Sequence, residues 1–292
     1  MTDGALLDPT FLRELEALRR RMVVRARSAG GGDHLAKRRG GSAEFLEHRP
    51  YSPGDDLRRI DWTAFARTGE PVFKLFRSEE DVVVRLVLDG SASLDVGEPR
   101  KMDVAKRLAA AVGYMALAAS ERTQVAVAGI GLARMTEPVR GRASLPKLLR
   151  DLGAVDPAGG TDLAASIDAV VLRSPRPGML VVVSDFLDAG AVGNAIVRAA
   201  SAGHDVALVQ VLAEEELRPT YEGDVAFQDS ETGEVVEVTV DAAAIDAYLV
   251  RLENLFGGLR ALAKKVRATY VRTSTREDLL PVMRRLVARG VD

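Results

Sequence analysis

The chain has no cysteine, one tryptophan and few aromatic residues, which make up 5% of its 292 residues. The absence of cysteine excludes disulfides, thiol nucleophiles and thiolate metal ligands, and it is typical of a protein from a reducing compartment. Positive and negative charges nearly cancel, with a formal net charge of −2. The molecule therefore has no general attraction to nucleic acid or anionic membranes, and any partner must be recognised locally.

Long hydrophobic runs are also absent. The most apolar helical stretch, Ala109 to Ala119, is bounded by charged residues and is shorter than the roughly 20 residues that span a bilayer. The first residues do not combine a basic start with an apolar run, so we expect no secretory signal. These features predict a cytoplasmic protein without a membrane span.

The N-terminal segment is basic. Apolar residues at three- and four-residue steps predict an amphipathic helix from about Asp8 to Arg27. Residues 13–39 contain nine Arg or Lys and three Asp or Glu, with almost no aromatic side chains on which bases could stack. We interpret the basic side as a solvated helix face and expect no nucleic-acid partner.

Residues 43–80 place dense opposite charges beside the only tryptophan. Turn sequences at Pro53–Asp55 and Thr68–Pro71 precede an alternating strand at Val72–Phe76. Two interpretations remain open: an ion-pair network that holds an N-terminal module on a larger domain, or a ligand-binding site. The residues concerned are Asp55, Asp56, Arg58, Arg59, Asp61, Trp62 and Arg67.

From Asp81 onward, strands and helices alternate. Continuous apolar runs such as Val181–Val183 are typical of parallel strands covered by helices on both faces. We expect an α/β fold with a doubly wound, mostly parallel, Rossmann-like sheet over residues 81–292, and a β-hairpin inserted at about 213–240. Residues 1–80 are expected to form an N-terminal helix and a charged β-hairpin module that packs on this domain.

The expected strands cover residues 82–88, 123–130, 179–184, 206–212 and 269–272. The expected helices cover residues 99–119, 145–152, 162–172, 191–202, 242–266 and 276–288.

Polar side chains follow two of these strands. Asp89, Ser91 and Ser93 come after the strand at 82–88, Thr161 precedes a helix, and Asp185 follows the strand at 179–184. Ligands of open parallel sheets bind beyond the carboxyl ends of the strands. Because all these groups are hard oxygen ligands without a neighbouring His or Cys, they favour Mg²⁺ or Mn²⁺.

A simpler interpretation exists for the first loop. Asp89, Ser91 and Ser93 alone would fit a hydrogen-bonded turn between strand and helix. The addition of Thr161 and Asp185 favours a metal site. Without metal, we expect the carboxylates of Asp89 and Asp185 to repel each other, so that Asp185→Ala would raise stability.

The pattern Asp-x-Ser-x-Ser, followed by Thr on a second loop and Asp on a third, resembles the metal-ion-dependent adhesion site of von Willebrand factor A domains. Over roughly residues 8–289 the chain also resembles the bacterial family called domain of unknown function 58. That resemblance depends on Glu47–Asp56, on Arg59–Trp62 with Ala66–Gly69, and on Asp229–Gly233.

The resemblance implies a metal-dependent protein–protein interaction module that acts as an adaptor or co-chaperone for a MoxR-type AAA+ ATPase. It also implies that Ser91, Ser93 and Thr161 coordinate the metal directly, while Asp89 and Asp185 act mainly through water. Neutral hydroxyl ligands leave the ion much of its charge. A carboxylate of the ATPase or its client would then complete the six oxygen ligands of Mg²⁺.

The alternative is a Mg²⁺-dependent phosphoryl-transfer or hydrolytic enzyme. The sequence has no Gly-x-x-x-x-Gly-Lys-Ser/Thr loop, and Asp89 and Ser93 occupy the glycine positions of a Gly-x-Ser-x-Gly elbow around Ser91. We interpret the three scattered histidines, His34, His48 and His204, as surface or packing residues. We therefore expect no catalysis.

Overall fold

The computed structural model describes residues 6–29, 44–51, 60–77, 82–174, 176–187 and 190–289. The chain divides into two compact units, one of residues 1–28 with 82–292 and one of residues 29–81. The N-terminal helix α1 (Pro9–Ala29) therefore belongs almost entirely to the larger unit. This grouping differs from the expected module of residues 1–80, which placed the helix with the charged hairpin.

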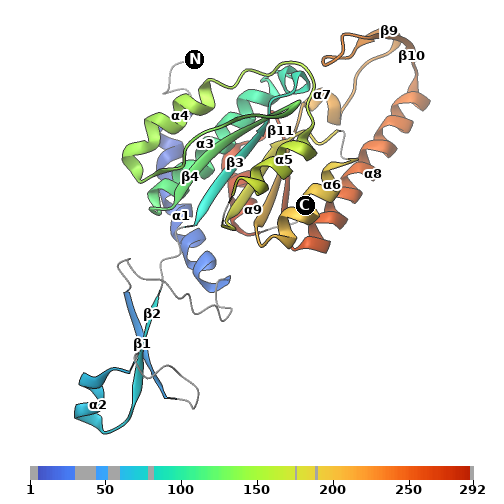
Figure 1. The fold of residues 1–292 in the computed structure, drawn as a ribbon. Coiled ribbons are helices and arrows are strands. Elements are labelled where there is room, and N and C mark those ends of the chain that lie inside the picture. Colours follow the sequence, from blue (N-terminus) through green and yellow to red (C-terminus); the bar gives the residue numbers. More distant parts are fainter. Residues whose placement is uncertain are drawn as a thin grey trace. The chain divides into compact units, whose positions relative to one another are not determined.

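The larger unit is built on a mostly parallel sheet, which confirms the expected α/β fold (Figure 1). The strand order is β11-β8-β7-β3-β4-β5, and β6 also pairs with β4. Pairing is parallel from β11 to β4, whereas β5 and β6 run antiparallel to β4. The bounds are β3 (Val83–Asp89), β4 (Arg122–Gly129), β5 (Gly131–Met135), β6 (Val139–Arg140), β7 (Met179–Ser184), β8 (Asp205–Leu212) and β11 (Thr269–Ser274).

Helices cover both faces of this sheet (Figure 1). Neighbouring residues of a strand point to opposite faces, so Leu86 and Leu88 of β3 pack in one core and Val87 packs in the other. The first core receives α1, α3 (Lys101–Ala118), α4 (Leu145–Gly153) and α9 (Leu279–Val287). The second core receives α5 (Leu163–Leu172), α6 (Val192–Ser201) and α8 (Ala242–Val266).

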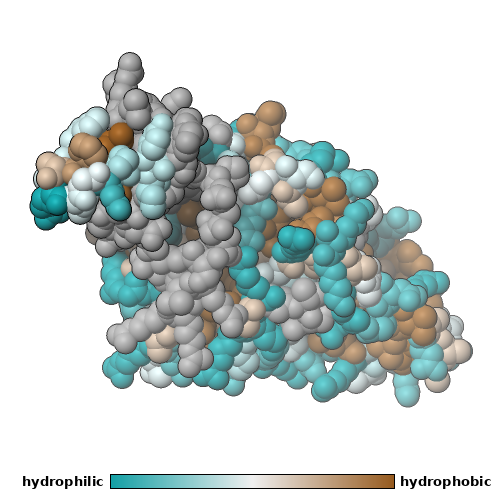
Figure 2. All heavy atoms as spheres, turned by 90° about the horizontal axis from the view of Figure 1, so that it is seen from below, coloured by the Kyte–Doolittle hydropathy of each residue, from teal (hydrophilic) through white to brown (hydrophobic). Residues whose placement is uncertain are grey.

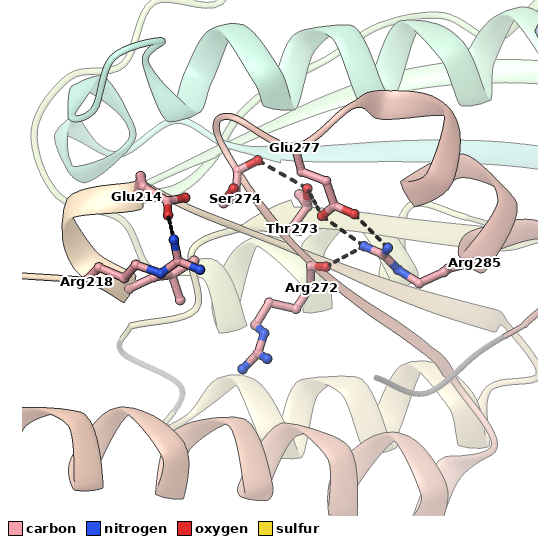
Figure 3. A pocket seen from close by; sticks show the side chains of 8 residues that line it. Glu214, Arg218, Arg272, Thr273, Ser274, Glu277 and Arg285 are labelled. Atoms are coloured by element: carbon pink, nitrogen blue, oxygen red, sulfur yellow. Dashed lines mark hydrogen bonds and ion pairs between the residues drawn. The ribbon is translucent and has the colours of Figure 1, made fainter.

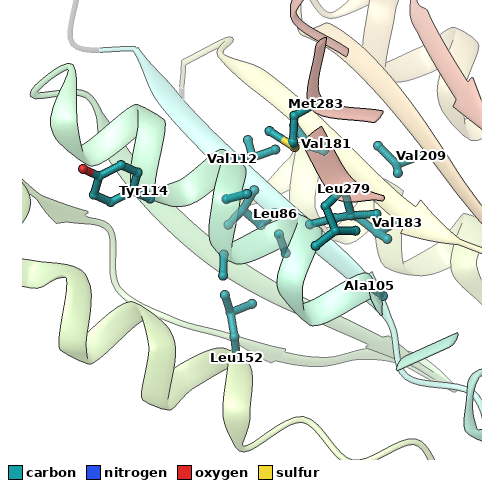
Figure 4. Packing of buried hydrophobic residues seen from close by; sticks show 14 of the residues in the cluster. Leu86, Ala105, Val112, Tyr114, Leu152, Val181, Val183, Val209, Leu279 and Met283 are labelled. Atoms are coloured by element: carbon teal, nitrogen blue, oxygen red, sulfur yellow. The ribbon is translucent and has the colours of Figure 1, made fainter. Parts of the chain in front are cut away.

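The first core explains why α3 is so apolar. Val112 of α3 packs with Leu86 and Val181 of the sheet and with Leu279 of α9 (Figure 4). Burial of the helix between sheet and neighbouring helices removes this surface from water, which is the dominant favourable contribution to folding. Within the described residues, no helix is both long and apolar enough to cross a bilayer.

Helix α1 is held on the first core by its apolar side. Asp8 caps its start, because Asp8 Oδ1 accepts hydrogen bonds from the backbone N–H groups of Thr10 and Phe11, both at 2.9 Å. Phe11 and Leu15 are buried in the core. The phenolic oxygen of Tyr114 in α3 donates to Glu16 Oε1 at 2.5 Å. The predicted amphipathic helix is therefore confirmed.

The predicted hairpin insertion is also confirmed. It follows β8 and the short helix α7 (Glu214–Leu217), and it consists of the antiparallel strands β9 (Gly223–Gln228) and β10 (Val235–Val240). All residues of both strands are exposed except Val225 and Val240, which are partly buried. The hairpin therefore has few packing contacts along its length.

In the smaller unit, β1 (Glu44–Pro50) pairs antiparallel with β2 (Val72–Arg77), and a short helix, α2 (Trp62–Thr68), lies between them in sequence. Asp61 caps α2, since its Oδ1 accepts from the N–H groups of Thr63 at 3.1 Å and Ala64 at 3.2 Å. The helix was not predicted from the sequence.

The charged segment around this helix is only partly described. Asp55, Asp56, Arg58 and Arg59 lie outside the described residues. Of the others, Asp61 is buried at the cap of α2, whereas Trp62 is 60% exposed and Arg67 is exposed. Trp62 makes an edge-to-face contact with Phe65, with ring centroids 5.9 Å apart. The ion-pair network and the ligand-binding alternative both stay predictions.

Hydrophilic residues cover much of the face seen in Figure 2, with smaller hydrophobic areas between them. This mixture is ordinary for a folded protein, because apolar atoms contribute more than half of the accessible surface of most proteins.

Candidate metal site at the carboxyl edge of the sheet

The strand order of the sheet reverses at β3. The next strand in the chain, β4, pairs with one edge of β3, and β7 pairs with the other. Loops that leave β3 and β7 therefore meet at the carboxyl ends of adjacent strands, which is where open α/β sheets bind ligands. Asp89 is the last residue of β3, and Asp185 directly follows β7.

The loop after β3 runs very close to β4. The Gly90 N–H donates to the carbonyl oxygen of Ala128 at 3.0 Å, and a Cβ at position 90 would lie 2.6 Å from that same oxygen. Glycine is needed here because a side chain would collide with backbone. The loop continues into a short 3₁₀ turn, Ala92–Asp95, which is anchored by the buried Leu94. Ser91 and Ser93 are thereby held beside Asp89.

Four of the five predicted metal ligands lie together. Ser91 Oγ is 2.9 Å from Ser93 Oγ, and Ser93 Oγ donates to Asp185 Oδ2 at 2.9 Å. Asp89 Oδ1 accepts from the Ser91 N–H at 3.0 Å, and its Oδ2 accepts from Ser184 Oγ at 2.6 Å. Burial raises the pKa of Asp89, hydrogen bonds from Ser184 and Ser91 lower it, and the charge of Asp185 raises it.

Thr161, the fifth predicted ligand, lies on the neighbouring loop. Backbone hydrogen bonds fix this loop to the loop after β3. The Ala92 N–H donates to the carbonyl oxygen of Gly159 at 2.8 Å, and the Ala158 N–H donates to the carbonyl oxygen of Gly90 at 2.9 Å. The hydroxyl of Thr161, however, donates to the carbonyl oxygen of Gly129 at 3.3 Å. No described hydrogen bond joins it to the serines or aspartates, so its role as a ligand stays a prediction.

A buried lysine, which sequence reasoning missed, pairs with Asp185. Lys101 Nζ at the start of α3 lies 2.8 Å from Asp185 Oδ2 and 2.6 Å from Glu216 Oε1 of α7. Lysine is almost never fully buried unless it is paired, and Lys101 is 0% exposed. The pair reverses our expectation for Asp185→Ala, because removal of the carboxylate would take a partner from a buried ammonium and lower stability.

A carboxylate from the hairpin was missed as well. Glu231 Oε2 lies 3.3 Å from the position that a Cβ on Gly160 would take, so the tip of the hairpin reaches the second loop of the site. Burial raises the pKa of Glu231, and the charges of Asp89 and Asp185 raise it further. The sequence showed the segment Asp229–Gly233 but not where its turn would lie.

Two hydrogen-bonded oxygen separations are compatible with shared coordination of magnesium. Bonds of 2.0–2.1 Å in an octahedron place adjacent ligand oxygens about 2.9 Å apart. That is the separation of Ser91 Oγ from Ser93 Oγ, and of Ser93 Oγ from Asp185 Oδ2. Among the described residues, no three His, Cys, Asp or Glu side chains are arranged to hold a metal. A metal bound at this edge of the sheet would therefore need the serine hydroxyls as ligands.

The charge around these oxygens also favours a cation. One ammonium, that of Lys101, pairs with two carboxylates, and the charge of one of these, Asp185, acts on two further carboxylates. The carboxylates are those of Asp89, Asp185, Glu216 and Glu231. Closely spaced like charges disfavour ionisation, and a divalent cation would relieve this repulsion.

A separate cavity of about 620 Å³ lies beyond the carboxyl end of β11 (Figure 3). Its charged groups are largely engaged: Arg285 pairs with Glu277 at 2.7 Å, and Arg218 pairs with Glu214 at 3.1 Å. The cavity contains none of the predicted metal ligands. Its lining residues are Glu214, Leu217, Arg218, Arg272, Thr273, Ser274, Glu277 and Arg285.

The chain matches the family described as "Protein of unknown function DUF58" over residues 47–253. The chain belongs to this family. The match includes all three segments on which the resemblance depended. Uncharacterised proteins of Mycobacterium tuberculosis and Mycobacterium bovis are each 35% identical to this DUF58 chain over 255 residues, covering 85% of it and 80% of the relative.

Among solved structures, the DUF58 chain is similar to a conserved hypothetical protein, BatB, from Bacteroides thetaiotaomicron, with 16% identity and a TM-score of 0.46. The similarity covers 71% of this chain and 98% of BatB. An aerotolerance-related membrane protein from Bacteroides fragilis gives 18% identity and a TM-score of 0.46, covering 71% of this chain and 99% of that protein.

Proposed function

We propose that this DUF58 protein is a metal-dependent protein-binding module in which Mg²⁺ or Mn²⁺ is held by Asp89, Ser91, Ser93, Thr161 and Asp185. The observation that supports this most directly is the chain of 2.9 Å oxygen contacts from Ser91 through Ser93 to Asp185 at the carboxyl edge of the sheet. When bound, the ion supplies a concentrated positive charge that attracts a carboxylate.

The residues of the chain have distinct tasks in this proposal. Ser91 and Ser93 provide neutral oxygen ligands, and Asp89 orients their loop through its contacts with the Ser91 N–H and with Ser184. Lys101 offsets part of the charge of Asp185. Because the direct ligands would be neutral hydroxyls, the ion would keep much of its charge to attract a further carboxylate.

The partner is proposed from the resemblance. The resemblance to the adhesion site of von Willebrand factor A domains implies an acidic partner residue, and the DUF58 resemblance implies a MoxR-type AAA+ ATPase or its client as the partner. The protein would then act as an adaptor or co-chaperone rather than as an enzyme.

The test is biolayer interferometry between the purified protein and a MoxR-type AAA+ ATPase from the same organism. We expect binding in millimolar Mg²⁺, and loss of binding both in EDTA and in the double variant Ser91→Ala/Ser93→Ala. Binding that EDTA leaves unchanged would contradict the proposal. Turnover of nucleotides or phosphate esters that the same double variant abolishes would instead support a Mg²⁺-dependent enzyme.

The glycine after Asp89 provides a further prediction. We expect Gly90→Ala to weaken Mg²⁺ binding about tenfold or more, because the added Cβ forces the ligand loop away from β4. Overpacking at this position should also cost about 1–3 kcal/mol of unfolding free energy. Isothermal titration calorimetry with Mg²⁺ and urea denaturation measure the two effects.

The matched control is Gly257→Ala in α8, where a Cβ would meet nothing within 4 Å. This variant should keep its Mg²⁺ affinity and gain a little stability, since alanine is favoured over glycine in a helix. Equal Mg²⁺ affinities for Gly90→Ala and Gly257→Ala would show that the position of the β3 loop does not determine metal binding.

A further inference from the structure

The hairpin that follows α7 ends in a turn of fixed shape. Asp229 Oδ1 accepts hydrogen bonds from the N–H groups of Glu231 and Thr232, both at 2.8 Å. The Gly233 N–H donates to the carbonyl oxygen of Asp229 at 2.8 Å, and Gly233 has a φ of +75°, which glycine adopts readily. The backbone that carries Glu231 is therefore held in one conformation before any ligand binds.

This turn delivers a carboxylate to the candidate site. Glu231 Oε2 lies 3.3 Å from the position that a Cβ on Gly160 would take, one residue before Thr161 in the chain, and the charges of Asp89 and Asp185 act on it. No ion pair is formed by Glu231 within the described part of the chain. A carboxylate placed among other carboxylates without a cation of its own is unfavourable unless a cation joins them.

The rest of the hairpin offers no other reason for this position. Its strands are exposed on both faces, so packing along β9 and β10 contributes little to holding the tip in place. The contact of Glu231 with Gly160 is therefore what connects the hairpin to the candidate site. It also has the chemistry that the proposed partner would supply, namely a carboxylate that approaches from outside the sheet.

We propose that Glu231 is a metal ligand supplied by the chain itself, which occupies the position that a partner carboxylate takes when it binds. This inference rests on the proposed function. Because Glu231 is tethered, its effective concentration at the ion is high, so a partner must displace it and the apparent affinity for the partner is lowered. The hairpin thus acts as a built-in competitor.

The experiment compares three forms of the full-length protein by calorimetric titration with Mg²⁺ alone: wild type, Glu231→Gln and Glu234→Gln. Glu234 is a matched control, since it is an exposed glutamate that directly follows the same turn. We expect the dissociation constant for Mg²⁺ to rise about tenfold in Glu231→Gln and to change less than about twofold in Glu234→Gln.

Hydrogen–deuterium exchange provides a second measurement. Mg²⁺ should slow exchange at the turn 229–233 in the wild type and in Glu234→Gln, but not in Glu231→Gln. The inference would be overturned if all three proteins had equal Mg²⁺ affinities, or if Mg²⁺ did not change the rate of hydrogen exchange at residues 229–233 of the wild type. Either result would leave the metal site intact. Failure of the wild type to bind Mg²⁺ would overturn the proposed function and this inference together.

Discussion

The variant Lys101→Met should lose about 3 kcal/mol of unfolding free energy in EDTA. Lys101 is fully buried and contacts two carboxylates, those of Asp185 and Glu216. Removal of the ammonium leaves both acids in a poorly solvated site without a counter-charge, and breaking a buried ion pair in this way typically costs about 3–5 kcal/mol. For a unit of this size the thermal midpoint should fall by roughly 6–12 °C.

The same variant should bind Mg²⁺ more tightly than the wild type. Without Lys101, Asp185 presents its full charge to the cation, so Mg²⁺ recovers part of the lost stability by binding only to the folded state. Differential scanning calorimetry in EDTA and in millimolar Mg²⁺ measures both effects. We expect Lys101→Met to have a much lower thermal midpoint than the wild type in EDTA, and a smaller difference from the wild type in Mg²⁺.

Lys106→Met is the control for Lys101→Met. Lys106 is a buried lysine of the same helix, but its Nζ donates to the carbonyl oxygen of Gly153 at 3.2 Å. Its replacement should cost only about 1 kcal/mol and respond to Mg²⁺ as the wild type does. If Lys101→Met lost as little unfolding free energy in EDTA as Lys106→Met, Lys101 would not balance the charge of the site.

Replacing both serines with alanine should lower Mg²⁺ affinity by more than about 100-fold. The double variant Ser91→Ala/Ser93→Ala removes two predicted ligands, and loss of groups that only orient ligands already costs about 10- to 100-fold. Because these hydroxyls also hydrogen-bond with each other and with Asp185, stability in EDTA should fall by about 1–2 kcal/mol. Calorimetric titration and urea denaturation in EDTA measure the two effects.

Ser166→Ala controls for the loss of a buried hydroxyl. Ser166 Oγ donates to the backbone oxygen of Asp162 at 2.9 Å in α5, and it has no contact with the predicted ligands in the described structure. The variant Ser166→Ala should lose about as much unfolding free energy as the double serine variant and keep the Mg²⁺ affinity of the wild type. A double serine variant that binds Mg²⁺ as tightly as Ser166→Ala would exclude the hydroxyls as ligands.

Much of the fold could be predicted from hydrophobic patterning. The run Val181–Val183 predicted a doubly covered strand, and β7 occupies the predicted residues 179–184. The helix predicted at 242–266 is also found with the same bounds. The antiparallel strands β5 and β6 were missed because they are short and only partly buried, so they lack a clear apolar period.

The candidate site could be predicted where it depends on single strands and their ends. Asp89 and Asp185 lie at the carboxyl ends of adjacent strands, and topology brings such positions together. Lys101 and Glu231 could not be predicted in the same way. Lys101, the first residue of α3, contacts Asp185 of a different loop, and Glu231 reaches Gly160 because a long insertion folds back over the loops. Both depend on tertiary packing that no local pattern records.

The most direct test of the account is a crystal structure of the protein with Mn²⁺, which scatters anomalously. We predict one anomalous peak about 2 Å from Ser91 Oγ and Ser93 Oγ, with Glu231 as a further ligand of the same ion. At a Mn²⁺ concentration that saturates the protein, the absence of a peak between these serines would contradict the metal site on which the proposed function depends.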